Sequence, residues 1–221
     1  MSIAIVSRDT PWTKDLVSKL SSMGVKHKWF CELDKQRLDE YEPSWVFFFH
    51  WSRIVDEDVF NKHRCVVIHT GTLPYHRGGT PIQNQIIRGV KTTDVNLITM
   101  EKQLDAGDIY CKQTISLQGS LRDIWMTISE VAAELIKKCI ERDLTPTPQS
   151  EVRAHTFKRI KTKPLDFLAK DGIMQIYDEI RMLDAENYPS CYVEIGEYRL
   201  EFSRAKIEED SIVSDVRIFK K

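Results

Sequence analysis

The chain has 221 residues, a formal net charge of −1 and a sequence pI near 6.6. Its hydrophobic content of 42% can fill a sizeable core, and its length suits one domain with or without a small appendage. The near-neutral charge excludes an overall basic field that would attract nucleic acid or anionic lipid. The sequence shows no signal peptide and no apolar run near the roughly 20 residues of a membrane span, so we expect a cytoplasmic protein without membrane contact. The five cysteines are dispersed and form no C-x-x-C pair, so we expect no metal site.

The first part of the chain alternates short apolar runs with helical patterns. The runs are almost continuously hydrophobic, which is typical of strands covered on both faces in a parallel sheet. A helix is expected over Pro11–Met23, because Pro11 opens the pattern and Gly24 ends it. The expected strands cover Ile3–Val6, Lys28–Phe30, Trp45–Phe49 and Cys65–Ile68.

The alternation continues through the middle of the chain. A helix is expected over Pro81–Arg88 with Gly89 as its stop, followed by strands over Val95–Met100 and Ile109–Leu117. The longest helix is expected over Ser120–Arg142, with Ser120 as its N-cap and apolar residues along one stripe. These patterns predict an α/β fold: a doubly wound, mostly parallel, Rossmann-like sheet over residues 1–143.

The composition changes after this domain. Leu144–Gln149 contains two prolines and is typical of a linker. A helical pattern follows over Ile173–Glu186, and three alternating runs then predict an antiparallel sheet. The three expected strands cover Cys191–Ile195, Tyr198–Ala205 and Ile212–Phe219. We therefore expect residues 150–221 to form a small C-terminal α+β appendage.

Two of the predicted strands end in histidine, at His50 and at His69. Ligands of open α/β sheets bind at the carboxyl ends of the strands. If these two strands are neighbours, their ends lie about 5 Å apart, which would place both imidazoles at one sheet edge. The alternative interpretation is a hydrogen-bonded structural histidine, and it stays open, more so for His50 than for His69.

A tight acidic turn between two predicted strands supplies the second candidate group, Asp105. A carboxylate beside the histidine loop would orient an imidazole and raise its basicity, although an acidic residue before glycine is also common in plain turns. Asp108 is better suited to bracing the turn. Gly78 and Gly79 precede a helix, as in a phosphate cradle, but the spacing matches neither a P-loop nor a dinucleotide fingerprint.

The region from His69 to Gln83 contains the pattern His-x-x-x-Leu-Pro-x-x-Arg-Gly-x-x-Pro-Ile-Gln, and residues 104–108 read Leu-Asp-Ala-Gly-Asp. Together these motifs resemble the folate-dependent formyltransferase family, clearly over residues 45–142 and more weakly beyond. The resemblance implies that His69 and Asp105 are catalytic and that N10-formyltetrahydrofolate donates the formyl group. It also implies that the folate lies along the segment after the third strand and against the acidic turn, at Trp51, Ser52, Arg53, Ile54, Gln103, Leu104 and Asp105.

The sequence departs from the family at one position. The family usually carries asparagine two residues before the histidine, where its amide binds the formyl oxygen, and this chain has Val67 there. A valine side chain donates no hydrogen bond. We expect His50 to supply the missing donor, because its strand end should neighbour that of His69. Gln83 and Asn84 are less suited, since they lie on a helix beyond the loop.

The resemblance leaves several acceptors open. Methionyl-tRNA formyltransferases are longer and carry a basic C-terminal β-barrel, whereas the run Lys158–Lys163 suits one or two phosphates or is a solvated loop. The appended helix and strands look like those of sugar N-formyltransferases, which often dimerise through C-terminal elements. We therefore expect a homodimer that formylates a nucleotide-linked amino sugar and has no nucleic-acid partner. The expected substrate contacts are Tyr75, His76, Arg77, Gly78, Gly79, Lys158 and Arg159, and Trp51, Tyr75 and Tyr188 are candidates to stack on sugar or base.

Three alternatives remain beside this prediction. The chain would transfer the formyl group to another small amine, hydrolyse the formyl-folate with water, or only bind folate after losing catalysis with its asparagine. Retention of both His69 and Asp105 favours an enzyme, because a module that only binds folate has no chemical need of the pair.

Overall fold

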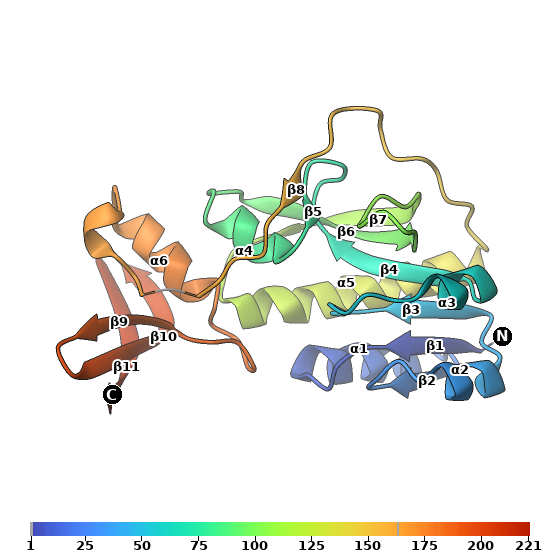
Figure 1. Ribbon diagram of the computed structural model, residues 1–221, viewed down its shortest axis with the longest axis horizontal. Helices are drawn as coiled ribbons and strands as arrows, with labels where there is room; N and C mark the ends of the chain where they lie inside the picture. Colours follow the sequence, from blue (N-terminus) through green and yellow to red (C-terminus); the bar gives the residue numbers. More distant parts are fainter. Residues whose placement is uncertain (1, 163) are drawn as a thin grey trace.

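A six-stranded sheet with the strand order β2-β1-β3-β4-β6-β7 forms the centre of the computed structural model, which describes residues 2–162 and 164–221 (Figure 1). The first four strands of that order are parallel, and β6 and β7 are antiparallel to their neighbours. The strands β1 and β3 are fully buried and β4 almost so, which agrees with the apolar runs of the sequence. The strands are β1 (Ile3–Val6), β2 (His27–Phe30), β3 (Trp45–Phe48), β4 (Cys65–Thr70), β6 (Thr92–Thr99) and β7 (Ile109–Ser116).

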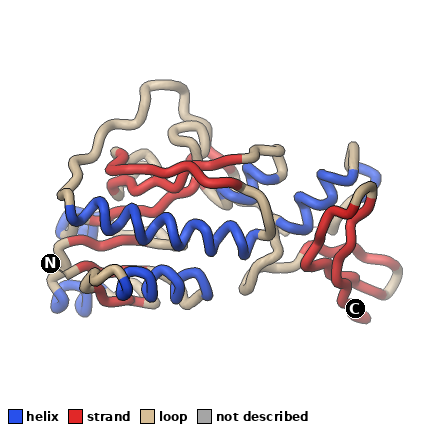
Figure 2. The backbone as a smooth tube through the Cα atoms, turned by 180° about the vertical axis from the view of Figure 1, so that it is seen from behind, coloured by secondary structure: helices blue, strands red, loops and turns tan. Residues whose placement is uncertain are grey.

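Helices cover both faces of this sheet. The two longest, α1 (Pro11–Ser22) and α5 (Leu121–Glu141), pack together on one face, which Figure 2 shows towards the viewer. The short helices α2 (Lys35–Tyr41) and α3 (Glu57–Lys62) bury residues against the opposite face. A capping box at Ser120 starts α5, since its hydroxyl accepts from the Asp123 amide and the Asp123 carboxylate accepts from the Ser120 amide.

The segment between β4 and β6 rises above the sheet and contains β5 (Arg77–Gly78) and α4 (Pro81–Ile86). The Leu73–Pro74 peptide bond within it is cis. The segment after α5 crosses back over the top of the molecule, where β8 (Thr156–Phe157) pairs in parallel with β5 (Figure 1). The predicted linker therefore returns the chain to the loop that follows β4.

The C-terminal part is a separate small sheet with one helix against it. A 3-10 turn, η1 (Phe167–Ala169), precedes α6 (Ile173–Arg181), which packs on β10 (Tyr198–Glu208) and β11 (Ser211–Lys220). The antiparallel order is β11-β10-β9, with β9 at Cys191–Ile195. The end of α6 attaches this part to the α/β sheet, because the buried Arg181 guanidinium donates to the carbonyls of Leu117 and Gly119.

The predicted α/β fold with a small C-terminal α+β part is confirmed. The helix expected over Ile173–Glu186 is wrong over residues 182–186, because it ends at Arg181 and the next residues turn tightly so that Met182 enters the main core. The sequence did not predict α2, α3, β5 or β8, which are all short. The division at residues 143 and 150 stays a prediction. Within residues 2–162 and 164–221, no helix has the length and apolar content needed to cross a membrane.

Candidate active site

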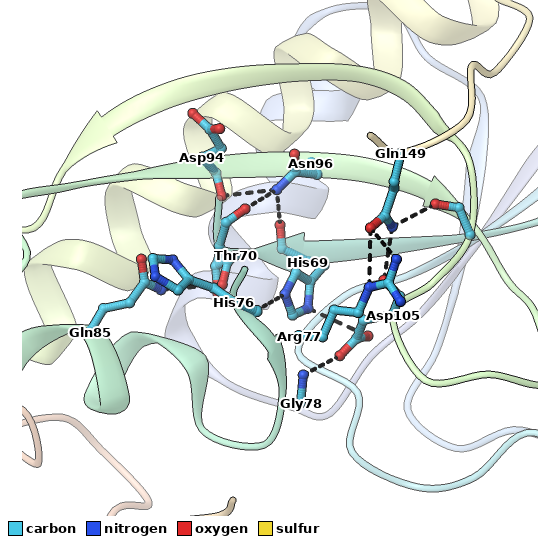
Figure 3. A network of polar contacts seen from close by, with 12 residues as sticks. His69, Thr70, His76, Arg77, Gly78, Gln85, Asp94, Asn96, Asp105 and Gln149 are labelled. Carbon is cyan, nitrogen blue, oxygen red and sulfur yellow. Dashed lines mark hydrogen bonds and ion pairs between the residues drawn. The ribbon is translucent and has the colours of Figure 1, made fainter. Parts of the chain in front are cut away.

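His69 lies near the carboxyl end of β4, where it is only 5% exposed. Its Nε2 lies 2.8 Å from the His76 carbonyl oxygen, so this nitrogen carries a proton, since a carbonyl only accepts. Its Nδ1 lies 3.4 Å from Asp105 Oδ1. The side-chain amide of Asn96, on the neighbouring strand β6, donates to the His69 carbonyl and fixes the backbone (Figure 3). The imidazole thus lies between two polar groups. The sequence predicted the Asp105 carboxylate, but it did not predict the His76 carbonyl.

Asp105 lies in the turn between β6 and β7 and adopts a φ of 52°, in the left-handed region. Its Oδ2 accepts a hydrogen bond of 2.9 Å from the Gly78 amide, which draws the turn towards the loop after β4. Gly78 itself has a φ of 100°, and an added Cβ would lie 2.4 Å from the Phe157 carbonyl oxygen. Only glycine satisfies this position. Gly78 therefore helps to orient the carboxylate, which is a reason for this glycine other than a phosphate cradle.

Gln149 braces the Asp105 turn from the other side. Its amide nitrogen donates to the carbonyls of Asp105 and Gly107 at 2.9 and 2.8 Å. Its amide oxygen accepts from the Arg77 guanidinium at 2.7 and 3.1 Å (Figure 3). No local pattern indicates this role, because Gln149 ends a proline-rich stretch and its partners lie more than 40 residues away in the chain.

A cavity of about 670 Å³ opens beside the His69–Asp105 pair. Its wall is formed by the carboxyl ends of β3 and β4, the loop after β1, the start of α4, and residues 187 and 188 of the C-terminal part. Val67 and His69 both line it, as expected for residues two apart on one strand face. The predicted site residues that line the cavity are His50, His69, Asp105, Trp51, Ser52, Arg53, Ile54, Leu104, Gly78, Gly79 and Arg159.

The other predicted contacts lie outside this lining. The His76 ring stacks on Phe157 at a centroid distance of 5.2 Å, and burial lowers its pKa. The Arg77 guanidinium is bound by Gln149. Gln103, Tyr75 and Lys158 are exposed residues away from the cavity wall, and Lys163 lies outside the described residues. A role of these residues in substrate or folate binding stays a prediction.

His50 follows β3, and β3 pairs with β4, so the expected neighbouring strand ends are confirmed. Its ring packs between Trp12 and Trp125, at centroid distances of 5.2 and 4.5 Å. Burial, with Arg8 nearby, lowers the pKa of His50 to about 4. Its Nε2 lies 3.0 Å from the Tyr188 hydroxyl, and its Nδ1 is buried without a partner among the described residues. His50 lines the cavity, but its Nε2 contacts the Tyr188 hydroxyl, and its expected role as the donor to the formyl oxygen stays a prediction.

Comparison with known families agrees with this geometry. A model described as "Formyl transferase" matches residues 17–133, which is more than half of the chain and includes both motifs. The chain belongs to the formyl transferase family. A second model, described as "Methionyl-tRNA formyltransferase, C-terminal domain", matches residues 165–219.

Individual relatives show how far the family likeness extends. The chain is 30% identical over 183 residues to methionyl-tRNA formyltransferase from Caldanaerobacter subterraneus, covering 79% of this chain and 58% of that protein. It therefore spans less than two thirds of that relative. A solved structure of methionyl-tRNA formyltransferase from Clostridium thermocellum is 33% identical, with a TM-score of 0.89 and full coverage of both chains.

These comparisons leave one part of the predicted resemblance unconfirmed. A sugar-modifying structure, the 4-N formyltransferase from Francisella tularensis, is 18% identical with a TM-score of 0.66, covering 97% of this chain and 96% of that one. At this identity it shows the fold alone. The C-terminal helix and strands, which we expected to be most similar to those of sugar N-formyltransferases, instead match the model named for methionyl-tRNA formyltransferase. The expected formyl transferase family is confirmed, and the sugar subfamily is not.

Proposed function

We propose that this formyl transferase moves the formyl group of N10-formyltetrahydrofolate to a primary amine. The observation that carries the proposal is the His69–Asp105 pair, 3.4 Å apart on the wall of a cavity at the carboxyl ends of the strands. Two polar networks hold it, one through Asn96 and one through Gln149. An acid–base site requires such preorganisation of its groups, whereas a module that only binds folate does not require it.

The proposed proton transfers follow from which ring nitrogen of His69 carries the proton. The amine nitrogen attacks the formyl carbon, the carbonyl oxygen gains negative charge, and the amine must lose a proton before the bond from the formyl carbon to N10 breaks. His69 Nε2 keeps its proton on the His76 carbonyl, so Nδ1 is the nitrogen available to take the amine's proton. The carboxylate of Asp105 beside Nδ1 stabilises the imidazolium that forms. Protonation of N10 as it departs then returns the proton and closes the balance.

For the folate pterin we propose the side of the cavity formed by residues 51–54 and by the acidic turn. Ile54 is 95% exposed and Leu104 is 62% exposed, although both are apolar and both line the cavity. Exposed apolar side chains at a cavity rim are typical of ligand contacts. They support the folate positions that the resemblance implied.

For the acceptor we propose a nucleotide-linked amino sugar. Three guanidinium groups, those of Arg8, Arg53 and Arg159, line the same cavity, whereas the Asp9 carboxylate there is paired with Lys14 at 2.8 Å. Arginines recognise phosphate oxygens through paired hydrogen bonds. A compact cavity with several arginines suits an amine that carries one or two phosphates.

Methionyl-tRNA is the second candidate acceptor, because the relatives named above are methionyl-tRNA formyltransferases. Neutralising many phosphates requires clustered basic residues, and the chain as a whole carries a net charge of −1. Charge therefore favours the smaller acceptor, and the names of the relatives favour the tRNA.

A homodimer is part of the proposal. The outer strand β11 exposes several apolar side chains, and a sheet edge of this kind is suited to pairing with a second copy. Light scattering of the purified protein would give twice the monomer mass, and a monomeric mass at micromolar concentration would remove this part. The exposed apolar residues of β11 are Val213, Val216, Ile218 and Phe219.

Mass spectrometry tests donor and acceptor together. The protein is incubated with N10-formyltetrahydrofolate and, separately, with UDP-, dTDP- and GDP-linked amino sugars or with methionyl-tRNA. We expect the mass of one formyl group to be added to one amino sugar. Formylation of methionyl-tRNA alone would replace the sugar by the second candidate. Release of formate without an amine would indicate hydrolysis, and folate binding without any product would leave only the binding module.

A further inference from the structure

Tyr188 reaches the catalytic cavity from the C-terminal part of the chain. It follows α6, packs against the core of the α/β sheet and lines the same cavity as His69 and Val67. Its hydroxyl lies 3.0 Å from Nε2 of His50, which is 138 residues away in the chain. The chain therefore uses its C-terminal part to complete a site that is otherwise formed by the first 160 residues.

Two ring nitrogens lie within hydrogen-bond distance of the Tyr188 hydroxyl. Trp125 Nε1 lies 3.1 Å away and can only donate, and His50 Nε2 lies 3.0 Å away. A tyrosine hydroxyl has two acceptor positions and one proton. Trp125 occupies one acceptor position, so the direction of the His50 contact decides where the proton points.

The buried atoms of His50 favour the form in which Nε2 carries the proton. If the proton were on Nδ1, a buried N–H would have no acceptor among the described residues, and such orphaned donors are rare. With the proton on Nε2, His50 and Trp125 both donate to the Tyr188 oxygen and fill its two acceptor positions. The hydroxyl proton is then left for a third partner, and Tyr188 itself lines the cavity.

We propose that the Tyr188 hydroxyl donates to the formyl oxygen during transfer and takes over the role of the asparagine that Val67 replaces. This inference rests on the proposed formyl transfer. The cavity lining supports it, because Val67 pairs with Phe48, two residues before His50, at the same edge of the sheet. Tyr188 is then a catalytic residue, and His50 is a positioning residue that acts through it.

The proposed contact needs no covalent step by Tyr188. As the amine attacks, the formyl oxygen becomes negative, and the O–H group stabilises it by a hydrogen bond that ends when the carbonyl re-forms. Burial raises the pKa of Tyr188, so the hydroxyl keeps its proton at neutral pH. Two N–H donors on its oxygen polarise the O–H bond and strengthen the donation.

The first test compares Tyr188→Phe with the matched variant Tyr110→Phe, whose hydroxyl bonds Arg64 instead. We expect Tyr188→Phe to lower kcat about 10²- to 10³-fold, the cost of one oxyanion donor, without changing the Kd of the formyl-folate. Tyr110→Phe should leave both constants unchanged. An unchanged kcat in Tyr188→Phe, or a change confined to the KM of the acceptor, overturns the inference.

A spectroscopic measurement separates donation from folding effects. A non-transferable formyl-folate analogue labelled with ¹³C in the formyl group is bound to each variant, and its carbonyl stretching frequency is recorded. We expect a lower frequency in the wild type than in Tyr188→Phe, and identical frequencies overturn the inference. If the wild type fails to bind the analogue, the proposed function fails too, which distinguishes the two outcomes.

Rescue variants test the two remaining steps. Val67→Asn in the Tyr188→Phe background restores the family's donor and should recover at least about tenfold in kcat. His50→Gln keeps an N–H for Tyr188 and should retain more activity than His50→Leu. Equal activity of the two His50 variants, or no rescue by a Val67→Asn chain that binds folate normally, contradicts the proposed roles.

Discussion

The brace of the Asp105 turn by Gln149 leads to a prediction that separates catalysis from stability. Gln149→Ala removes two hydrogen bonds to the carbonyls of Asp105 and Gly107, each worth about 0.5–1.5 kcal/mol, or about 1–3 kcal/mol together. If this free energy serves to hold the carboxylate beside His69, its loss lowers kcat/KM by about 5- to 150-fold, since 1.36 kcal/mol is a factor of ten. The same loss lowers Tm by about 2–12 °C in a chain of this length.

Two further variants make this prediction specific. Gln149→Glu keeps an acceptor for Arg77 but loses the donor to both carbonyls, so we expect kcat/KM to fall at least as far as in Gln149→Ala. Gln113→Ala, an exposed glutamine on β7, is the control and should change neither kcat/KM nor Tm. The measurements are initial rates of formyl transfer and thermal melts. Wild-type kcat/KM in Gln149→Glu would refute the reasoning, because the link to Arg77 would then be sufficient.

Three further predictions concern the pH dependence of stability, the space around a glycine, and the Arg181 contact that attaches the C-terminal part to the α/β sheet. In the folded protein the pKa of His50 is about 4, below its ordinary value of 6.5, so the unfolded chain takes up the proton first as the pH falls. Urea melts should therefore show a loss of about 3 kcal/mol in the free energy of unfolding between pH 6.5 and pH 4. The loss should be smaller in His50→Gln. Gly107→Ala would place Cβ 1.9 Å from the Thr99 carbonyl oxygen and should displace the Asp105 turn and reduce turnover, whereas Gly172→Ala, with no atom within 4 Å, should be neutral in the same assay. Arg181→Met leaves Asp178 buried without its 2.6 Å partner and should cost about 3–5 kcal/mol of unfolding free energy, with part recovered in the double variant Asp178→Asn/Arg181→Met. An unchanged free energy of unfolding in Arg181→Met would show that the Arg181–Asp178 contact does not stabilise the attachment of the C-terminal part.

Apolar runs, capping residues and turn residues predicted those features of the fold that depend on residues near one another in the sequence. The strands that end near His50 and His69 follow from buried apolar runs, and the start of α5 follows from a capping residue. The Asp105 turn was predictable as a carboxylate between two strands. Its approach to His69 depends on the loop after β4, where the Gly78 amide meets the carboxylate. That approach was suggested by the motif and not by periodicity.

The residues that sequence reasoning missed make contacts over long separations. Gln149 bonds carbonyls 42 and 44 residues away, and its own neighbourhood indicates only a linker. Tyr188 was noted as an aromatic residue able to stack on a ligand, but its hydroxyl contact with His50 spans 138 residues. Propensity and spacing carry no information on such pairs. The same limit applies to His50: its expected role as a donor stays a prediction, and the group at its Nε2 comes from Tyr188, far along the chain.

Transfer of an isotopically labelled formyl group tests whether the His69–Asp105 pair is the catalytic centre. N10-[¹³C]formyltetrahydrofolate is incubated with the wild type and with His69→Ala, in the presence of the acceptor that gives product, and the acceptor is analysed by mass spectrometry. We expect labelled formyl-acceptor with the wild type. With His69→Ala we expect a rate lower by at least about 10²-fold and an unchanged Kd for the folate. Wild-type rates in His69→Ala would contradict the assignment of the His69–Asp105 pair as the catalytic centre.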